Sequence, residues 1–194
     1  MRILPILFNT DMVRALLDGR KTVTRRVVKF KPGQNRQWTG YTPDGPVLYG
    51  SNNIPAAKSP YHPGDILYVR ETFFRDNAGG YHYRADDDVI FFERDIGHGI
   101  GWTFPKWHPS IHMPKEAARL FLRVTGVRVE RLRDITPDGI AAEGVGSECT
   151  FIYLWDDTIK TADRDRYGWA ANPWVWVIEF ERISKEAAVK GREE

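Results

Sequence analysis

The fold is decided by the stretch Asp18-Gly19-Arg20-Lys21-Thr22-Val23-Thr24-Arg25-Arg26, in which a short helix is expected to end and a strand to begin. Upstream, Asn9 or Thr10 can cap a helix with one apolar stripe, and Gly19 is the residue type that ends helices in the left-handed conformation. Downstream, residues 22–28 are rich in β-branched side chains, which favours a strand. The transition therefore gathers a lysine, hydroxyl groups and arginines at one turn of the backbone.

Length and charge place limits on the organisation and on the ligand. The 194 residues suit one domain, which we expect over residues 1–184, with Gly/Pro-rich surface insertions near 30–63 and 86–114 and a frayed charged tail at 185–194. The formal net charge is only +2, yet the first 36 residues contain nine Lys and Arg against two Asp. This local excess points to an anionic ligand.

The cysteine count and the N-terminus indicate a reducing compartment. Cys149 stands alone, so neither a disulfide framework nor a thiolate zinc cluster can form. The apolar stretch of residues 1–8 is too short for a membrane span and reads as a first strand. We expect a cytoplasmic monomer that uses no cofactor and does not contact a membrane.

Further periodic segments complete the expected fold. Strands are expected at residues 65–74, 80–85, 120–129 (bent at Gly126) and 174–183. Together with residues 1–8 and 22–28 they make about six strands. Short helices are expected after the cap at Thr136, ending near Gly144, and over residues 151–159. Without a βαβ rhythm, this order favours an α+β fold with a closed or nearly closed mixed β-barrel.

Two of these segments resemble a known family. The motif from Gly19 to Arg26 resembles the ASCH-domain signature, with Thr24 where many members have glutamate; the N4-acetylcytidine amidohydrolases of that superfamily also have threonine there. Residues 131–143 resemble the stretch that carries a glutamate in that enzyme group, and the matching position is Glu143. The whole pattern, including residues 107–114, also resembles uncharacterised ASCH-like proteins of phages and prophages.

The resemblance implies a PUA-like β-barrel, a fold used for RNA and modified bases, and it implies that Lys21, Thr24 and Glu143 work together. Hydrolysis of an exocyclic amide needs a nucleophile, a base and a group that stabilises the oxyanion. We expect Thr24 to attack the acyl carbonyl and Lys21 to be its base, provided that burial and nearby cations lower the lysine pKa. Glu143 either orients Lys21 or activates a water molecule while Thr24 only binds, and an ionised Glu143 would oppose the base role of Lys21.

Four further residues are candidates for binding the substrate. Arg26 suits an oxyanion or a phosphate, Arg25 and Arg20 lie in the same cationic run, and Glu71 is a second candidate acid beside Arg70. Each also has a purely structural explanation, since phosphate-positioning cations and cross-strand ion pairs use the same residue types. Strict strand alternation would separate Lys21 from Thr24, so the catalytic hypothesis requires an irregular turn between residues 19 and 23.

Three functions from different classes stay open. The first is an amidohydrolase that deacylates a pyrimidine nucleoside, the second is an RNA or modified-nucleotide binding module, and the third is an ASCH-type ribonuclease using the same cationic cleft. A metal centre is not expected, because Pro109 disfavours the helix that would align His108 with His112, and no third ligand is suitably spaced.

Overall fold

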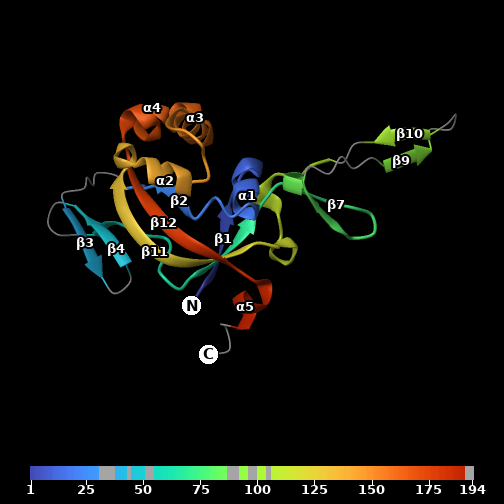
Figure 1. The fold of residues 1–194 in the computed structure, drawn as a ribbon, viewed down its shortest axis with the longest axis horizontal. Coiled ribbons are helices and arrows are strands. Elements are labelled where there is room, and N and C mark those ends of the chain that lie inside the picture. Colours follow the sequence, from blue (N-terminus) through green and yellow to red (C-terminus); the bar gives the residue numbers. More distant parts are fainter. Residues whose placement is uncertain are drawn as a thin grey trace.

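A five-stranded sheet, in the order β1-β6-β11-β12-β2, forms the centre of this mixed α+β protein (Figure 1). The computed structural model describes residues 1–30, 38–42, 45–50, 55–86, 92–95, 100–103 and 106–190. The sheet consists of β1 (Ile3–Leu7), β2 (Val23–Val27), β6 (Ile66–Arg70), β11 (Phe121–Arg131) and β12 (Trp174–Ile183).

The strand pairing confirms the two long strands expected from the sequence. β1 runs parallel to β6, and the other three pairings in the sheet are antiparallel. The register of β11 against β12 shifts between Val124 and Gly126, which is the bend expected at Gly126.

The described helices include the two whose capping residues the sequence predicts. The α-helices are α1 (Thr10–Leu17), α2 (Pro137–Ala142), α3 (Glu148–Thr158), α4 (Arg164–Tyr167) and α5 (Lys185–Lys190). The Asn9 side chain accepts a hydrogen bond from Met12 N at 2.9 Å, and Thr136 accepts one from Gly139 N at 3.1 Å. In Figure 1, α2, α3 and α4 gather at the top, while α1 lies beside β1.

The segments at residues 30–63 and 185–194 differ from what the sequence predicts. The segment 30–63, expected to be an irregular surface excursion, contains a sheet of β3 (Trp38–Thr42), β4 (Gly45–Tyr49) and β5 (Pro55–Lys58), and Leu48 lies fully buried in the main core. Residues 185–190 form α5 instead of a frayed tail, because Ala188 is fully buried. Residues 191–194 lie outside the described chain.

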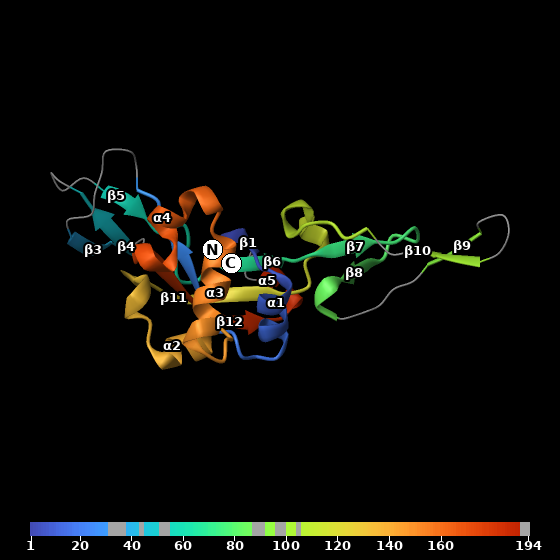
Figure 2. The ribbon, with the colours of Figure 1, turned by 90° about the horizontal axis from the view of Figure 1, so that it is seen from above.

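The closed six-stranded barrel is not confirmed. Residues 65–74 are not one strand: the chain leaves the sheet after β6, and β7 (Phe73–Arg75) pairs with β8 (Tyr81–Tyr83). The segment of β8 was expected to be one of about six barrel strands. Another hairpin, β9 (Phe92–Asp95) with β10 (Ile100–Thr103), lies at the far right of Figure 2.

The edge strands of the main sheet nevertheless approach each other. No register joins β1 to β2 among the residues that the structure describes. A guanidinium nitrogen of Arg26, on β2, donates to the main-chain oxygen of Leu7, the last residue of β1, at 2.8 Å. The sheet is therefore curled but open, and α1 connects its two edges.

Apolar side chains fill both faces of the sheet. One cluster packs α1 against the sheet through residues such as Phe8, Val13 and Ile178. Another packs α2 and α3 against the opposite face through residues such as Ile140 and Phe151. Since each fully buried side chain of this size contributes about 1.5–3 kcal/mol, these clusters fix the positions of α1, α2 and α3 around β2.

Candidate active site

Lys21 lies in an irregular connection between α1 and β2. Gly19 has φ +73°, so the helix ends in the left-handed conformation as the sequence predicts. The Lys21 main chain donates to Ala15 O at 3.0 Å and forms an isolated bridge with Glu143, and β2 begins only at Val23. Strand alternation therefore does not apply to Lys21, and the irregular turn that the catalytic hypothesis requires is present.

The Lys21 side chain is fully buried against Glu143. Its Nζ lies 2.5 Å from Glu143 Oε2 and donates to the main-chain oxygen of the same residue at 3.0 Å. Glu143 is the residue that ends α2, and its amide is held by main-chain oxygens of that helix. Two segments that lie 122 positions apart in sequence are thus joined at one buried ion pair.

Arg25 binds the second oxygen of the same carboxylate. Its Nη1 donates to Glu143 Oε1 at 3.1 Å, and its Nε and Nη2 donate to Glu130 Oε1 at 2.9 and 2.8 Å. All three nitrogens of Arg25 are therefore engaged by carboxylates of the protein. These contacts hold Glu143 in position. The binding of substrate by Arg25 therefore stays a prediction.

Thr24 and Arg26 share the opposite face of β2 from Arg25, as strand alternation requires. Arg26 Cζ lies 5.3 Å from the centre of the Phe8 ring, and Lys21 Nζ lies 5.5 Å from the same centre. Lys21 and Arg26 thus meet at one aromatic ring. Thr24 and Glu143 line the same cavity, and Lys21 reaches the site through its contact with Glu143.

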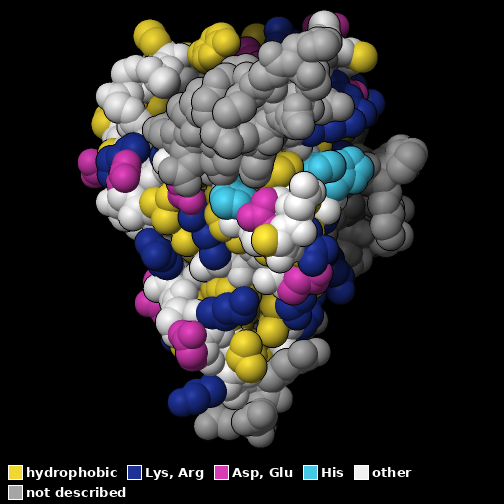
Figure 3. Space-filling model, turned by 90° about the vertical axis from the view of Figure 1, so that its right-hand side faces the viewer, with side chains coloured by type: hydrophobic (Ala, Val, Ile, Leu, Met, Phe, Trp, Pro, Cys, Tyr) yellow, Lys and Arg dark blue, Asp and Glu magenta, His cyan; other side chains and the backbone are white. Residues whose placement is uncertain are grey.

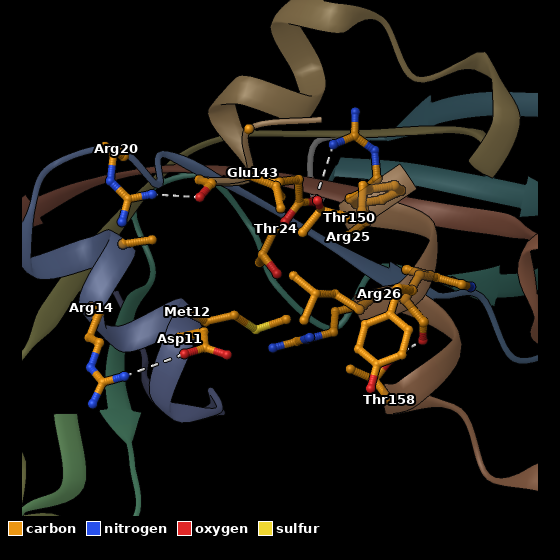
Figure 4. A pocket seen from close by; sticks show the side chains of 18 residues that line it. Asp11, Met12, Arg14, Arg20, Thr24, Arg25, Arg26, Glu143, Thr150 and Thr158 are labelled. Atoms are coloured by element: carbon orange, nitrogen blue, oxygen red, sulfur yellow. Dashed lines mark hydrogen bonds and ion pairs between the residues drawn. The ribbon is translucent and has the colours of Figure 1, made fainter. Parts of the chain in front are cut away.

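The Thr24 hydroxyl has an unusual environment. The residue is only 1% exposed, and the described residues provide no hydrogen-bond partner for its side chain. Figure 4 shows the hydroxyl directed into a cavity and the Arg26 guanidinium entering the same space. A buried hydroxyl normally has a partner, because leaving one unpaired costs about 1–3 kcal/mol.

The cavity has a volume of about 460 Å³ and lies between α1, β2, the end of α2, and α3. Its polar wall contains Thr24, Arg26 and Glu143, and its apolar wall contains Met12 and Leu154, among others. Volumes of about 300–1,000 Å³ with mainly apolar walls and a few convergent polar groups are typical of small-molecule sites.

Burial sets the electrostatics of Lys21. Loss of hydration lowers the pKa of its amine from the usual range, the Glu143 carboxylate acts in the opposite direction, and Arg26 and Arg25 lower the pKa further. The lowered pKa is the condition under which this lysine can act as a base.

The remaining predicted site residues lie at the edge of the cavity or outside it. Arg20 lines the rim, where it is exposed, pairs with Asp18 at 2.7 Å and donates to Gly144 O at 2.7 Å. Glu71 does not line the cavity; both of its oxygens accept hydrogen bonds from Arg119, at 2.9 and 3.0 Å. The structure therefore does not join Glu71 to the Lys21–Glu143 pair through any described ion pair.

Sequence reasoning missed two contributors. Glu130 holds Arg25, and Phe8 provides the ring shared by Lys21 and Arg26. The signal for Glu130 was a carboxylate at the end of a long strand between Arg128 and Arg131, because a carboxylate that becomes largely buried needs a cation. Phe8 gave no such signal, because an apolar residue after a strand is expected simply to be core.

The described residues also lack two features of other classes of protein. None of the helices in these parts of the chain combines the length and apolar character needed to cross a membrane. No group of three His, Cys, Asp or Glu side chains within the described ranges is arranged to hold a metal ion.

Comparisons with known proteins leave the function to be inferred from the site. No model of a known protein family and no curated protein matches the chain. Among solved structures, the chain is similar to a hypothetical protein, PH0355, with 14% sequence identity over 94% of this chain and 100% of that chain and a TM-score of 0.42.

Proposed function

We propose that the protein is an amidohydrolase that removes an acyl group from the exocyclic nitrogen of a modified pyrimidine nucleoside such as N4-acetylcytidine. The observation that carries the proposal is the Thr24 hydroxyl, which is buried without a described protein partner and directed into a cavity that is also lined by Glu143, the partner of Lys21. A group that is costly to bury unpaired is explained if its partner is a substrate.

In the proposed reaction, Thr24 Oγ1 forms a bond to the acyl carbon and its proton passes to neutral Lys21 Nζ. The bond from this carbon to the exocyclic nitrogen breaks, and Lys21 returns the proton to the leaving nitrogen, which releases cytidine. Water then hydrolyses the threonine ester with Lys21 again as the base, giving the carboxylic acid and free Thr24.

The contacts of Lys21 are consistent with this role. A neutral amine has two N–H groups and one lone pair, and the two contacts to Glu143 Oε2 and Glu143 O use the two N–H groups. The lone pair then stays available to accept a proton. Thr24 Oγ1 and Lys21 Nζ are not hydrogen-bonded to each other in the structure, so substrate binding must shorten their approach, as is common at catalytic sites.

Arg26 is the proposed oxyanion group. It enters the cavity, forms a hydrogen bond to Leu7 O, and has no carboxylate partner among the described residues, unlike Arg20 and Arg25. A guanidinium in this state retains N–H groups for a developing negative charge.

The same feature of Arg26 favours a second function. A cation facing a cavity without a carboxylate partner also suits a phosphate oxygen, so we keep binding of RNA or a modified nucleotide, with or without ribonuclease activity, as the alternative. On the face shown in Figure 3, however, Lys and Arg side chains are interspersed with Asp and Glu over the described surface. RNA binding is more typical of a continuous basic surface.

The open, curled sheet can be related to the barrel expected from the sequence. We propose that the curled sheet corresponds to a PUA-like barrel whose edges β1 and β2 approach each other at the Arg26–Leu7 contact. That contact and the packing of α1 against the sheet support this relationship.

The test is release of cytidine from N4-acetylcytidine by the purified protein, followed by chromatography, with Thr24→Val and Lys21→Met as controls. We expect turnover by the wild type and its loss in both variants. A folded wild type without turnover would contradict the amidohydrolase proposal. Binding of a single-stranded RNA that weakens steeply with added salt would then support the alternative.

A further inference from the structure

Four side chains of alternating charge form a continuous chain behind the cavity, and at its more exposed end Arg128 Nε also donates to Glu130 Oε2 at 3.4 Å. Glu130 accepts from Arg25, Arg25 donates to Glu143, and Glu143 binds Lys21, with donor–acceptor distances between 2.5 and 3.1 Å. The chain begins on β11, crosses β2 and reaches the end of α2. Each of the two inner groups therefore has partners of opposite charge on both sides.

Burial makes these charges interact strongly. The side chains of Lys21, Arg25 and Glu143 are 0%, 2% and 5% exposed, and that of Glu130 is 17% exposed. Interactions between charges are weakly screened in such surroundings, because the effective dielectric constant is far below that of water. A change of charge at Glu130 or Arg25 should therefore change the protonation equilibrium of Lys21.

The backbone around Arg25 is shaped to admit its guanidinium. A Cβ placed on Gly139, in the first turn of α2, would lie 3.1 Å from Arg25 Nη2. Gly139 has no side chain to crowd that nitrogen. The space at Gly139 therefore accommodates the guanidinium of Arg25, which binds the Glu143 carboxylate.

We propose that Arg25, held in place by Glu130, is a positioning residue that shares the Glu143 carboxylate with Lys21 and thereby keeps Lys21 available as a base. The inference rests on the proposed function, since the base role of Lys21 is part of it. Arg25 acts through Glu143 and is not assigned contact with the reacting atoms.

The charged groups around Lys21 determine the sign of the effect. From the end of α2 it faces Glu143, from β2 it is influenced by Arg25 and Arg26, and the neutral ring of Phe8, the residue after β1, lies against it. On α1, Asp11 and Arg14 at the cavity rim pair with each other at 3.6 Å.

Neutralising Arg25 and neutralising Glu130 should shift the pKa of Lys21 in opposite directions. Arg25→Met removes a cation and leaves the whole Glu143 charge to Lys21, so the pKa of Lys21 should rise. Glu130→Gln removes an anion, so that Arg25 interacts more strongly with Glu143 and the pKa of Lys21 should fall. A purely structural role for the pair would not give opposite signs.

The experiment is a pH titration of protein labelled with ¹³C at lysine Cε, followed by NMR, with the Lys21 signal assigned by its loss in Lys21→Arg. The full chain is used, and the variants are Arg25→Met, Arg25→Lys and Glu130→Gln. Arg123→Met and Glu181→Gln provide matched controls, because these residues form an exposed cross-strand pair at 3.1 Å in the same sheet. Neither control variant should move the Lys21 midpoint.

The expected result is a higher midpoint in Arg25→Met, a lower one in Glu130→Gln, and a smaller change in Arg25→Lys. If Arg25→Met fails to fold, Glu130→Gln decides the matter, and an unchanged or raised midpoint there overturns the inference. Moving the midpoint by one pH unit changes the neutral fraction of Lys21 about tenfold, and activity at fixed pH should follow in the same direction. Because the titration needs no substrate, opposite shifts without turnover of N4-acetylcytidine would uphold the electrostatic coupling and contradict only the proposed function.

Discussion

Lys21 Nζ contacts Glu143 twice, through a carboxylate oxygen at 2.5 Å and through the main-chain oxygen at 3.0 Å. The side-chain contact balances charge, while the main-chain contact fixes the amine relative to the end of α2. A lysine fully shielded from water would otherwise strongly favour its neutral form. The pair is therefore both the structural junction between α1 and α2 and the chemical centre of the proposed site.

Thr24→Val should lower the activity of the protein without lowering its stability. The substitution removes a buried hydroxyl that has no described partner and keeps the β-branched shape, so the free energy of unfolding should stay the same or rise by up to about 1–3 kcal/mol. Turnover should fall at least about 100-fold, while Thr24→Ser should retain activity. Denaturant unfolding and cytidine release check the two effects. A clearly destabilised Thr24→Val protein would show that the hydroxyl has a structural partner.

Lys21→Met should destabilise the protein by about 3–5 kcal/mol, because it leaves Glu143 buried with one cation fewer. In the double variant Lys21→Met/Glu143→Leu the loss should be smaller than the sum of the two single losses, with a coupling energy of about 0.5–3 kcal/mol. Urea unfolding of the four proteins in the cycle measures it.

The exposed pair Arg123–Glu181 is the control for this cycle, since both side chains are about half exposed. Its coupling energy should be below about 1 kcal/mol. A Lys21–Glu143 coupling no larger than that of the control pair would contradict the assignment of the buried pair as the junction between α1 and α2.

Local sequence signals predicted the elements that build the site. Asn9 and Thr136 identified the helix starts, Gly19 identified the end of α1, and Gly126 marked the bend of β11. These features depend on backbone geometry and short-range hydrogen bonds, which a few neighbouring residues determine. The placement of Lys21 beside Glu143 came only from the resemblance, because no local rule joins residues so far apart in sequence.

The expected closure of the barrel failed for a long-range reason. Alternation identified residues 80–85 as a strand but could not identify its partner, and the structure pairs β8 with β7 outside the main sheet. The chain leaves the sheet after Arg70 where the buried Glu71 binds Arg119. Strand pairing of this kind depends on contacts between distant residues, which periodicity does not report.

Activity should rise with pH if Lys21 is the base. Only the neutral amine can accept the Thr24 proton, and burial lowers the pKa of Lys21, so kcat/KM should increase through a midpoint below the ordinary lysine value of about 10.4. Stability should change with the same sign: between the folded and unfolded pKa values the unfolded chain binds more protons, so the free energy of unfolding rises with pH. An activity profile that rises only in the acid range, where carboxylates lose their protons, would instead assign the base role to Glu143.

Glu71→Gln should leave the turnover of N4-acetylcytidine within about threefold of the wild type, because Glu71 does not line the cavity and lies outside the described contacts of Lys21.

Arg119→Met should destabilise the protein by about 3–5 kcal/mol, since it removes the cation from the Glu71 carboxylate, which is only 1% exposed.

The pH dependence of the Arg119→Met loss follows from the ionisation of Glu71. Burial raises the pKa of Glu71 and Arg119 opposes the rise, so without Arg119 the folded-state pKa lies higher still. The folded protein then binds the extra proton, and stability falls as pH rises through that range. Unfolding free energies at acid and neutral pH check this, and a loss that does not depend on pH would show that Arg119 stabilises the fold mainly by packing on Tyr83, whose ring centre lies 3.9 Å from it.

Gly144→Ala should disturb the site more than Gly19→Ala does. Both glycines have positive φ, +83° and +73°, so either substitution costs about 1–2 kcal/mol in backbone strain. A Cβ at Gly144 would in addition lie 2.6 Å from Ala15 Cβ and 3.1 Å from Lys21 Cβ, whereas a Cβ at Gly19 meets nothing within 4 Å. The crowding should add about 1–3 kcal/mol and lower turnover by displacing Lys21 from Glu143. Thermal unfolding and activity of the two variants isolate this contribution, because the backbone strain is common to both; equal losses would mean that the close approach of α2 to α1 is relieved without moving Lys21.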